Sequence, residues 1–142
     1  GVGAPVQASL APLEIGKSEC RRQGEKIAIL AFGSRLMPAL QAADTLNASE
    51  VNMRFIKPLD EAMGLKMAES HDYLITIEEN ALMGGAGAAV LEGLQKNRVV
   101  IHTLCLGLPD QFIEHGQHET MLAECGLYAN GIRLAIENLI SE

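Results

Sequence analysis

The sequence predicts one α/β domain of three layers, in which a mostly parallel sheet with a short edge strand carries helices on both faces. The run 27–32 (IAILAF) is apolar at every position, which is typical of a central parallel strand covered from both sides. Apolar runs then alternate with segments of helical period, as in sheets built from right-handed strand–helix–strand units. The 142 residues, of which 48% are hydrophobic, suffice for one core.

Charge and cysteine content argue against several classes of protein. The formal net charge of −7 disfavours nucleic-acid binding, which needs clustered Lys and Arg. No apolar stretch approaches the roughly 20 residues of a membrane-spanning helix. The three cysteines form no CxxC pair and suit a reducing compartment. We therefore expect a cytoplasmic protein that binds neither nucleic acid nor membrane.

The first part of the chain predicts a lead-in, an edge strand and a helix. Residues 1–12 are small and proline-punctuated, so we interpret them as a linker from an upstream domain, with the domain itself at 13–142. Residues 13–22 predict the edge strand, and Gln23-Gly24 the turn into the central strand. Apolar residues at helical spacing then predict a helix as far as Asn47: Leu36, Leu40, Ala43 and Leu46.

A second strand and a capped helix follow. Val51, Met53 and Phe55 alternate with polar residues, so we expect a strand that Pro58 ends. Asp60 is placed to cap a helix with an apolar stripe, which consists of Leu59, Met63 and Met67.

Two buried strands and three helices complete the predicted fold. The strands are expected at 73–77 and 99–106, and the helix between them bears Val90, Leu91 and Leu94. A loop at 107–117 leads to a short helix at 119–124, which Gly126 stops. The last helix places four apolar residues on one face: Ile132, Ile136, Leu139 and Ile140.

The turn Gly84-Gly85-Ala86-Gly87 follows a strand and opens a helix, where backbone amides and the helix dipole could hold an anion. The turn lacks the third small residue of the dinucleotide fingerprint, and the next strand ends in Leu106 without an acid to hold a ribose. We favour the other interpretation, a turn in which glycine allows close packing, including packing against a neighbouring domain.

Glu78 and Glu79 stand at the expected carboxyl end of a parallel strand, where open α/β sheets bind ligands. They could act as acid and base, but consecutive side chains in a strand point to opposite faces. We favour a contact role, in which one carboxylate accepts hydrogen bonds from a backbone amide or an arginine across an interface.

Arg54, Lys57 and Asp60 surround a strand end and a helix start, and the two cations could hold a phosphate. The alternative that we favour is an Arg54 paired with a local acid and an Asp60 that caps its helix.

The four histidines lack the spacing of a metal site, and we expect each to be structural. They are His71, His102, His115 and His118. We predict His102 to be a hydrogen-bonded core residue and Cys105 to be buried, because both stand in an apolar run.

Three segments resemble the C-terminal domain of 1-deoxy-D-xylulose-5-phosphate synthase, a transketolase-like thiamine diphosphate enzyme. They are 53–61 (MRFIKPLDE), 77–87 (IEENALMGGAG) and 107–110 (GLPD) with Phe112-Ile113. The resemblance extends from about Leu13 to the end of the chain. Transketolases and the β subunits of 2-oxo acid dehydrogenases share a looser version of the pattern and remain alternatives, as does a stand-alone anion- or nucleotide-binding regulatory module.

The resemblance implies a homodimeric enzyme that uses thiamine diphosphate and Mg²⁺ to condense pyruvate with glyceraldehyde 3-phosphate. Such enzymes hold the cofactor and metal in upstream domains through a Gly-Asp-Gly motif, which this sequence lacks. It therefore implies no catalytic, cofactor-binding or metal-binding residue here, and an inactive isolated chain. It also implies that the segment from Glu78 to Gly87 faces a neighbouring domain or the second subunit. The full set of residues that we expect at an interdomain or dimer contact is Arg54, Lys57, Asp60, Glu78, Glu79, Asn80, Gly84, Gly85 and Gly87.

Two positions depart from the family pattern. Tyr128 stands where an acidic helix cap is usual, so we expect Asn130 to cap the last helix instead. Ala88 stands where a serine is common after the glycine turn.

Overall fold

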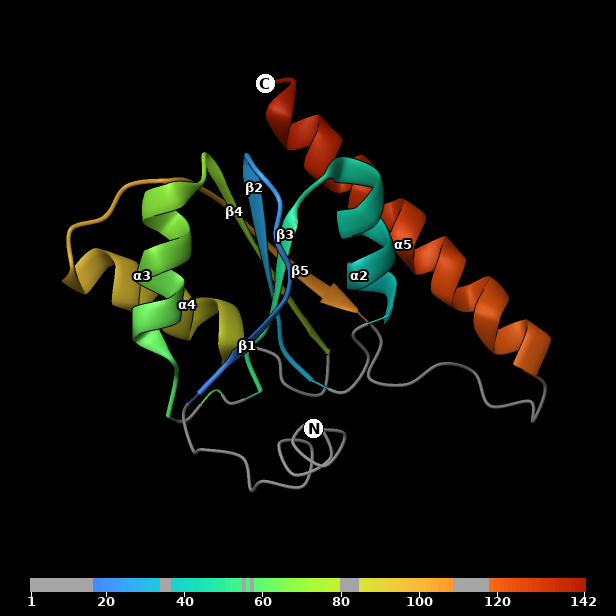
Figure 1. Cartoon of the computed structure of the whole chain (residues 1–142), viewed down its shortest axis with the longest axis horizontal. Coiled ribbons are helices and arrows are strands. Elements are labelled where there is room, and N and C mark those ends of the chain that lie inside the picture. Colours follow the sequence, from blue (N-terminus) through green and yellow to red (C-terminus); the bar gives the residue numbers. More distant parts are fainter. Residues whose placement is uncertain (1–16, 34–36, 55, 57, 80–84, 109–117) are drawn as a thin grey trace, which may run out of the picture.

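The sheet has five strands in the order β1-β3-β2-β4-β5. A computed structural model of the chain describes residues 17–142 apart from 34–36, 55, 57, 80–84 and 109–117 (Figure 1). The predicted lead-in at 1–12 lies outside the described residues. β1 pairs antiparallel with β3, and the other neighbours pair in parallel. The strands are β1 (Glu19–Arg22), β2 (Ile27–Ala31), β3 (Ser49–Asn52), β4 (Tyr73–Glu79) and β5 (His102–Leu108).

Helices cover both faces of the sheet, as the sequence predicts. One face packs against α2 (Met37–Leu46) and α5 (His118–Ile140), and the other against α3 (Glu61–Ser70) and α4 (Ala86–Lys96). Figure 1 shows the α3–α4 layer to the left of the sheet and the α2–α5 layer to the right. The predicted three-layer α/β architecture with a short edge strand is thus confirmed.

The central strand β2 divides the core into two clusters. All five of its residues are buried. Ile27, Ile29 and Ala31 belong to the cluster under α2 and α5, while Ala28 and Leu30 belong to the cluster under α3 and α4. A strand that is apolar on both faces is needed because it lies between two helix layers.

The second predicted strand is shorter than the sequence suggests. β3 ends at Asn52 instead of continuing to Phe55. Arg54 has a φ of 65°, in the left-handed region, and its amide nitrogen donates to Asn52 Oδ1 at 3.1 Å. This local turn takes the chain out of the sheet before Pro58.

The predicted break near Gly126 is wrong, because α5 runs without interruption from His118 to Ile140. A helical glycine costs only about 1 kcal/mol relative to alanine, and burial of Ile132 and Ile136 against the sheet offsets that loss. Asn130 therefore lies inside the helix and caps nothing. Its Oδ1 instead accepts from Arg133 Nη2 at 3.2 Å.

The last strand is an edge strand and is less buried than predicted. β5 begins at His102 rather than at residue 99 and includes Gly107 and Leu108, which we expected in a loop. His102 and Cys105 are exposed, contrary to prediction, because β5 has a neighbour only on the β4 side of the described sheet. The His102 ring stacks on Tyr73 at 5.6 Å between ring centroids.

Two apolar residues expected on buried helix faces are also largely exposed. Leu91 of α4 is 46% exposed and Ile140 of α5 is 39% exposed.

Candidate interdomain contact site

The described members of the predicted contact set lie at one edge of the sheet. β2, β3, β4 and β5 run in parallel, so their carboxyl ends share an edge, which we call the carboxyl edge. Arg54 follows β3, Asp60 caps α3, and Glu78 stands near the end of β4. Gly85 and Gly87 begin α4 at the same edge. Lys57, Asn80 and Gly84 fall outside the described residues, as does the side chain of Glu79.

Glu78 already occupies the helix N-terminus that could have held a foreign anion. Its side chain is only 8% exposed, and its Oε2 accepts from the Gly87 amide nitrogen at 2.7 Å. Gly87 is the second residue of α4, after the N-cap Gly85. A carboxylate at this position satisfies a backbone donor and complements the helix dipole. Glu78 therefore accepts from a backbone amide of its own domain, whereas the sequence predicted such a hydrogen bond across an interface.

Gly87 also packs closely against the sheet. A β-carbon at this position would lie 3.0 Å from Cys105 Sγ and 3.3 Å from Thr76 Oγ1. The small residue thus lets the first turn of α4 approach β4 and β5, which fits the packing interpretation of the glycine turn. The Thr76 hydroxyl is buried, and no described residue is its hydrogen-bond partner.

Arg54 and Asp60 do not converge on a common site. Arg54 Nη2 lies 3.5 Å from Glu19 Oε1, and Asp60 Oδ1 accepts from the Met63 amide nitrogen at 3.2 Å. Arg54 is therefore paired with an acid and Asp60 caps its helix, as the interpretation that we favoured from the sequence predicts. Of the two cations of the phosphate-binding alternative, Arg54 is paired with Glu19 and Lys57 lies outside the described residues.

Asp60 also makes contacts that the sequence did not suggest. Its Oδ2 accepts from the amide nitrogen and the hydroxyl of Ser18, at 2.9 and 2.8 Å. Burial alone would raise the pKa of Asp60, but the hydrogen bonds from Ser18 and Met63 and the charge of Lys17 outweigh it and lower the pKa.

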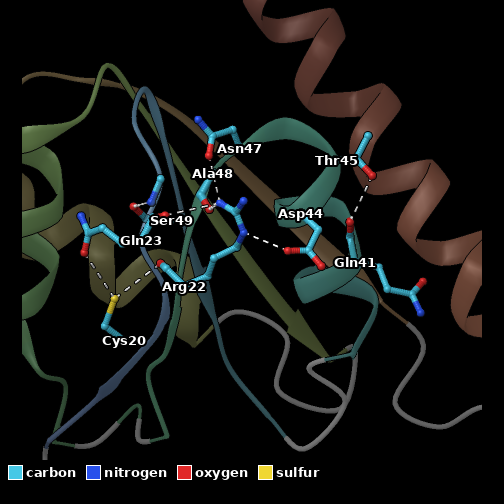
Figure 2. Close-up of polar contacts among 10 residues, drawn as sticks. Cys20, Arg22, Gln23, Gln41, Asp44, Thr45, Asn47, Ala48 and Ser49 are labelled. Atoms are coloured by element: carbon cyan, nitrogen blue, oxygen red, sulfur yellow. Dashed lines mark hydrogen bonds and ion pairs between the residues drawn. The ribbon is translucent and has the colours of Figure 1, made fainter.

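Sequence reasoning also missed Arg22, whose guanidinium joins β1 to α2 and to the turn before β3 (Figure 2). Nε donates to Asp44 Oδ1 at 2.9 Å, and Nη1 donates to the Ala48 carbonyl at 2.8 Å. Nη1 also lies 3.3 Å from Asn47 Oδ1. No local pattern singles out Arg22, because its partners are more than 20 residues away in the sequence.

Glu50 is a second residue that periodicity could not identify. It lies in β3 at 1% exposure, and its Oε2 has no hydrogen-bond partner among the described residues. Burial raises its pKa to about 7, Glu19 adds to the rise, and Arg21 opposes it. A carboxyl of this kind is a cost to stability at neutral pH.

The described residues do not form a metal site. They contain no group of three His, Cys, Asp or Glu side chains that could hold a metal ion. His71 is engaged in structural contacts, with Nε2 at 2.8 Å from Ser49 Oγ and Nδ1 at 2.8 Å from the Met67 carbonyl. His115 and the side chain of His118 lie outside the description. None of the helices, over the residues described, has the length and apolar character to cross a membrane.

Comparison with known proteins identifies the family. Residues 16–132 match the family model described as transketolase, C-terminal domain. The chain belongs to this family. It is 58% identical over 142 residues to 1-deoxy-D-xylulose-5-phosphate synthase of Methylobacillus flagellatus, covering 100% of the chain and 23% of that relative. It is 56% identical over 137 residues to the same enzyme of Pseudomonas putida, covering 96% of the chain and 22% of that relative.

A solved structure supports the same assignment. A split gene transketolase, described as an inactive β4 tetramer, superposes with a TM-score of 0.73 at 28% identity, over 93% of this chain and 44% of that one. The resemblance predicted from the sequence is therefore confirmed. The chain spans less than a quarter of the length of the synthases that it matches.

Proposed function

We propose that this chain is the C-terminal domain of a 1-deoxy-D-xylulose-5-phosphate synthase. The whole enzyme would be a cytoplasmic, homodimeric transferase that condenses pyruvate with glyceraldehyde 3-phosphate and releases CO2, for isoprenoid, thiamine and pyridoxal biosynthesis. The observation that carries the proposal is 58% identity along the entire chain to such a synthase. The 28% identity to the transketolase makes that alternative weaker.

The cofactors belong, in this proposal, to other domains of the enzyme. Thiamine diphosphate in such an enzyme supplies the electron sink for decarboxylation, and Mg²⁺ holds its diphosphate. The described residues lack a cluster of metal ligands, and the α4 N-terminus already holds the Glu78 carboxylate. The residues of this domain would therefore contribute position and contact, with no chemical step of their own.

The contact role falls to the carboxyl edge. The predicted contact residues comprise Arg54, Lys57, Asp60, Glu78, Glu79, Asn80, Gly84, Gly85 and Gly87. The described members of this set all lie at that edge. We propose that this edge faces the neighbouring domain or the second subunit. Glu78 would act there indirectly, by fixing the start of α4, because its Oε2 already accepts from Gly87.

Activity assays on the full-length protein test the assignment. We expect release of CO2 from pyruvate that depends on glyceraldehyde 3-phosphate, thiamine diphosphate and Mg²⁺, and no turnover by the 142-residue chain alone. Acetyl transfer to lipoamide would instead favour a 2-oxo acid dehydrogenase. Turnover of pyruvate by the isolated chain would contradict the proposed division of labour between domains.

Hydrogen exchange tests the contact role separately. Peptides covering 53–62 and 78–90 should exchange more slowly in the full-length enzyme than in the isolated chain. The opposite edge supplies an internal control, because Lys26 and Asp72 lie at the amino ends of β2 and β4. Equal protection at both edges, or none at either, would contradict a contact confined to the carboxyl edge.

A further inference from the structure

The entering segment is attached to the domain by more than strand pairing. β1 has four residues, of which three are exposed, and its pairing with β3 contains an irregularity between Cys20 and Arg22. A short, irregular edge strand supplies few backbone hydrogen bonds to fix its position. Side-chain contacts with distant parts of the chain must therefore contribute much of the attachment.

Asp60 provides the contact at the start of this segment. One of its carboxylate oxygens accepts from Met63 in the first turn of α3, and the other accepts both donors of Ser18, 42 residues away in the sequence. A carboxylate has two oxygens and accepts only, so it can serve the helix and the segment at once. The Glu19–Arg54 ion pair at 3.5 Å links the entering segment also to the turn after β3.

The place of this contact determines where the preceding chain joins the domain. Glu19 pairs with Asn52, the last residue of β3, so Ser18 lies at the carboxyl edge. Asp60 holds it there, on the side of the sheet where α3 begins.

We infer that Asp60 is a clasp, a residue that fixes the entering segment at Ser18 to the N-terminus of α3 and so sets the point at which the preceding chain joins the carboxyl edge. This inference rests on the contacts of Asp60 and Ser18 alone and holds whichever enzyme the domain belongs to. It distinguishes Asp60 from an ordinary helix cap, which would leave Ser18 untouched.

Amide exchange measured by NMR on the ¹⁵N-labelled 142-residue chain tests the clasp with an Asp60→Asn variant. Asparagine caps a helix about as well as aspartate. Met63 and Ser18 donate to different oxygens of Asp60, and asparagine has an NH2 donor in place of one of these oxygens, so it cannot accept on both sides. We expect the Ser18 amide to exchange at least about tenfold faster in the variant, since hydrogen bonds to a charged acceptor are the stronger kind. The Met63 amide should change much less.

The Met63 amide in the same spectra decides the outcome. A rise in exchange at Ser18 that exceeds the rise at Met63 supports the clasp, and a rise at Ser18 no larger than that at Met63 overturns it. A Glu19→Gln variant provides the matched control, because it weakens the ion pair to Arg54 and leaves the Asp60 contacts in place. Exchange at Ser18 as fast in this control as in Asp60→Asn would also overturn the assignment to Asp60.

Discussion

The two edge strands of the sheet, β1 and β5, are held in place in opposite ways. β1 has four residues, three of them charged, and side chains attach it at both ends: Ser18 and Glu19 at one end, Arg22 at the other. β5 has seven residues without Asp, Glu, Lys or Arg, and each pairs in regular parallel register with β4. Charge and irregularity are common protections of an exposed edge, and only β1 has them.

The comparison shows that the two edge strands should respond differently to mutation. A strand fixed by a few side-chain contacts depends on each of them, whereas a strand fixed by a continuous backbone ladder loses little when one side chain changes. Substitutions around β1 should therefore alter stability far more than substitutions at exposed positions of β5.

The largest effect is expected from Gly24→Ala, in the turn after β1. A β-carbon here would collide with the Ala48 backbone and the Asn47 carbonyl, and the Gly24 amide nitrogen donates to Ser49 Oγ at 2.8 Å. Because backbone atoms cannot move aside cheaply, we expect a loss of about 3 kcal/mol in the free energy of unfolding. Urea denaturation measures it.

Gly64→Ala in α3 is the matched control, because no atom in the described part of the chain lies within 4 Å of its would-be β-carbon. It should stabilise the protein by about 0.5–1 kcal/mol through helix propensity. Equal losses in both variants would mean that the close approach at Gly24 is not the cause.

Glu50→Gln, at a position beside β1, should change the free energy of unfolding by an amount that depends on pH. Burial raises the pKa of Glu50 from 4.5 to about 7, so its ionisation opposes folding. The cost is absent below about pH 4.5, where the group is protonated folded or unfolded, and is complete above about pH 7. The variant should exceed the natural protein in unfolding free energy by on the order of 1–3 kcal/mol at pH 8.

The advantage of Glu50→Gln should shrink steadily as the pH falls to 4.5. Urea denaturation across this range measures it, with Glu92→Gln at an exposed position of α4 as control. An advantage of Glu50→Gln that stayed constant with pH would show that ionisation of Glu50 is not its source.

The sequence predicted those features of the molecule that depend on neighbouring residues. The apolar run of β2 and the cap at Asp60 are local patterns, and both are confirmed. The continuity of α5 was missed because a glycine is a local signal for the end of a helix. Whether the helix continues past Gly126 depends instead on its packing against the sheet. The second partner of Asp60 was missed because Ser18 is 42 residues away, and no residue spacing encodes such a pair.

Arg22→Ala tests the far attachment of β1. The substitution removes the hydrogen bonds to Asp44 and the Ala48 carbonyl and should cost about 1–2 kcal/mol. The expected loss of stability is modest because the Asp44 side chain is 71% exposed and solvent screens the ion pair. Thermal or urea unfolding in a Glu50→Gln background gives the value without interference from the ionisation of Glu50.

Arg21→Ala is the companion measurement for Arg22. The Arg21 side chain is 43% exposed and makes an ion pair with Glu19 at 3.9 Å, so its loss should stay within about 0.5 kcal/mol. Similar losses for the two arginines would indicate that general charge, rather than the contacts in Figure 2, holds this end of β1.

Cys105→Ser, at an exposed position of β5, should have the smallest effect, within about 0.5 kcal/mol of the natural protein. Cys105 is exposed, so in a Cys20→Ser, Cys125→Ser background its thiol should react with a disulfide reagent without prior unfolding. The labelling rate would then stay constant through low urea concentrations. Labelling only at the unfolding rate would mean that Cys105 is buried, as its apolar surroundings in the sequence suggest. The contrast between the edges would then weaken, because β5 would be held by packed side chains as well as by its backbone ladder.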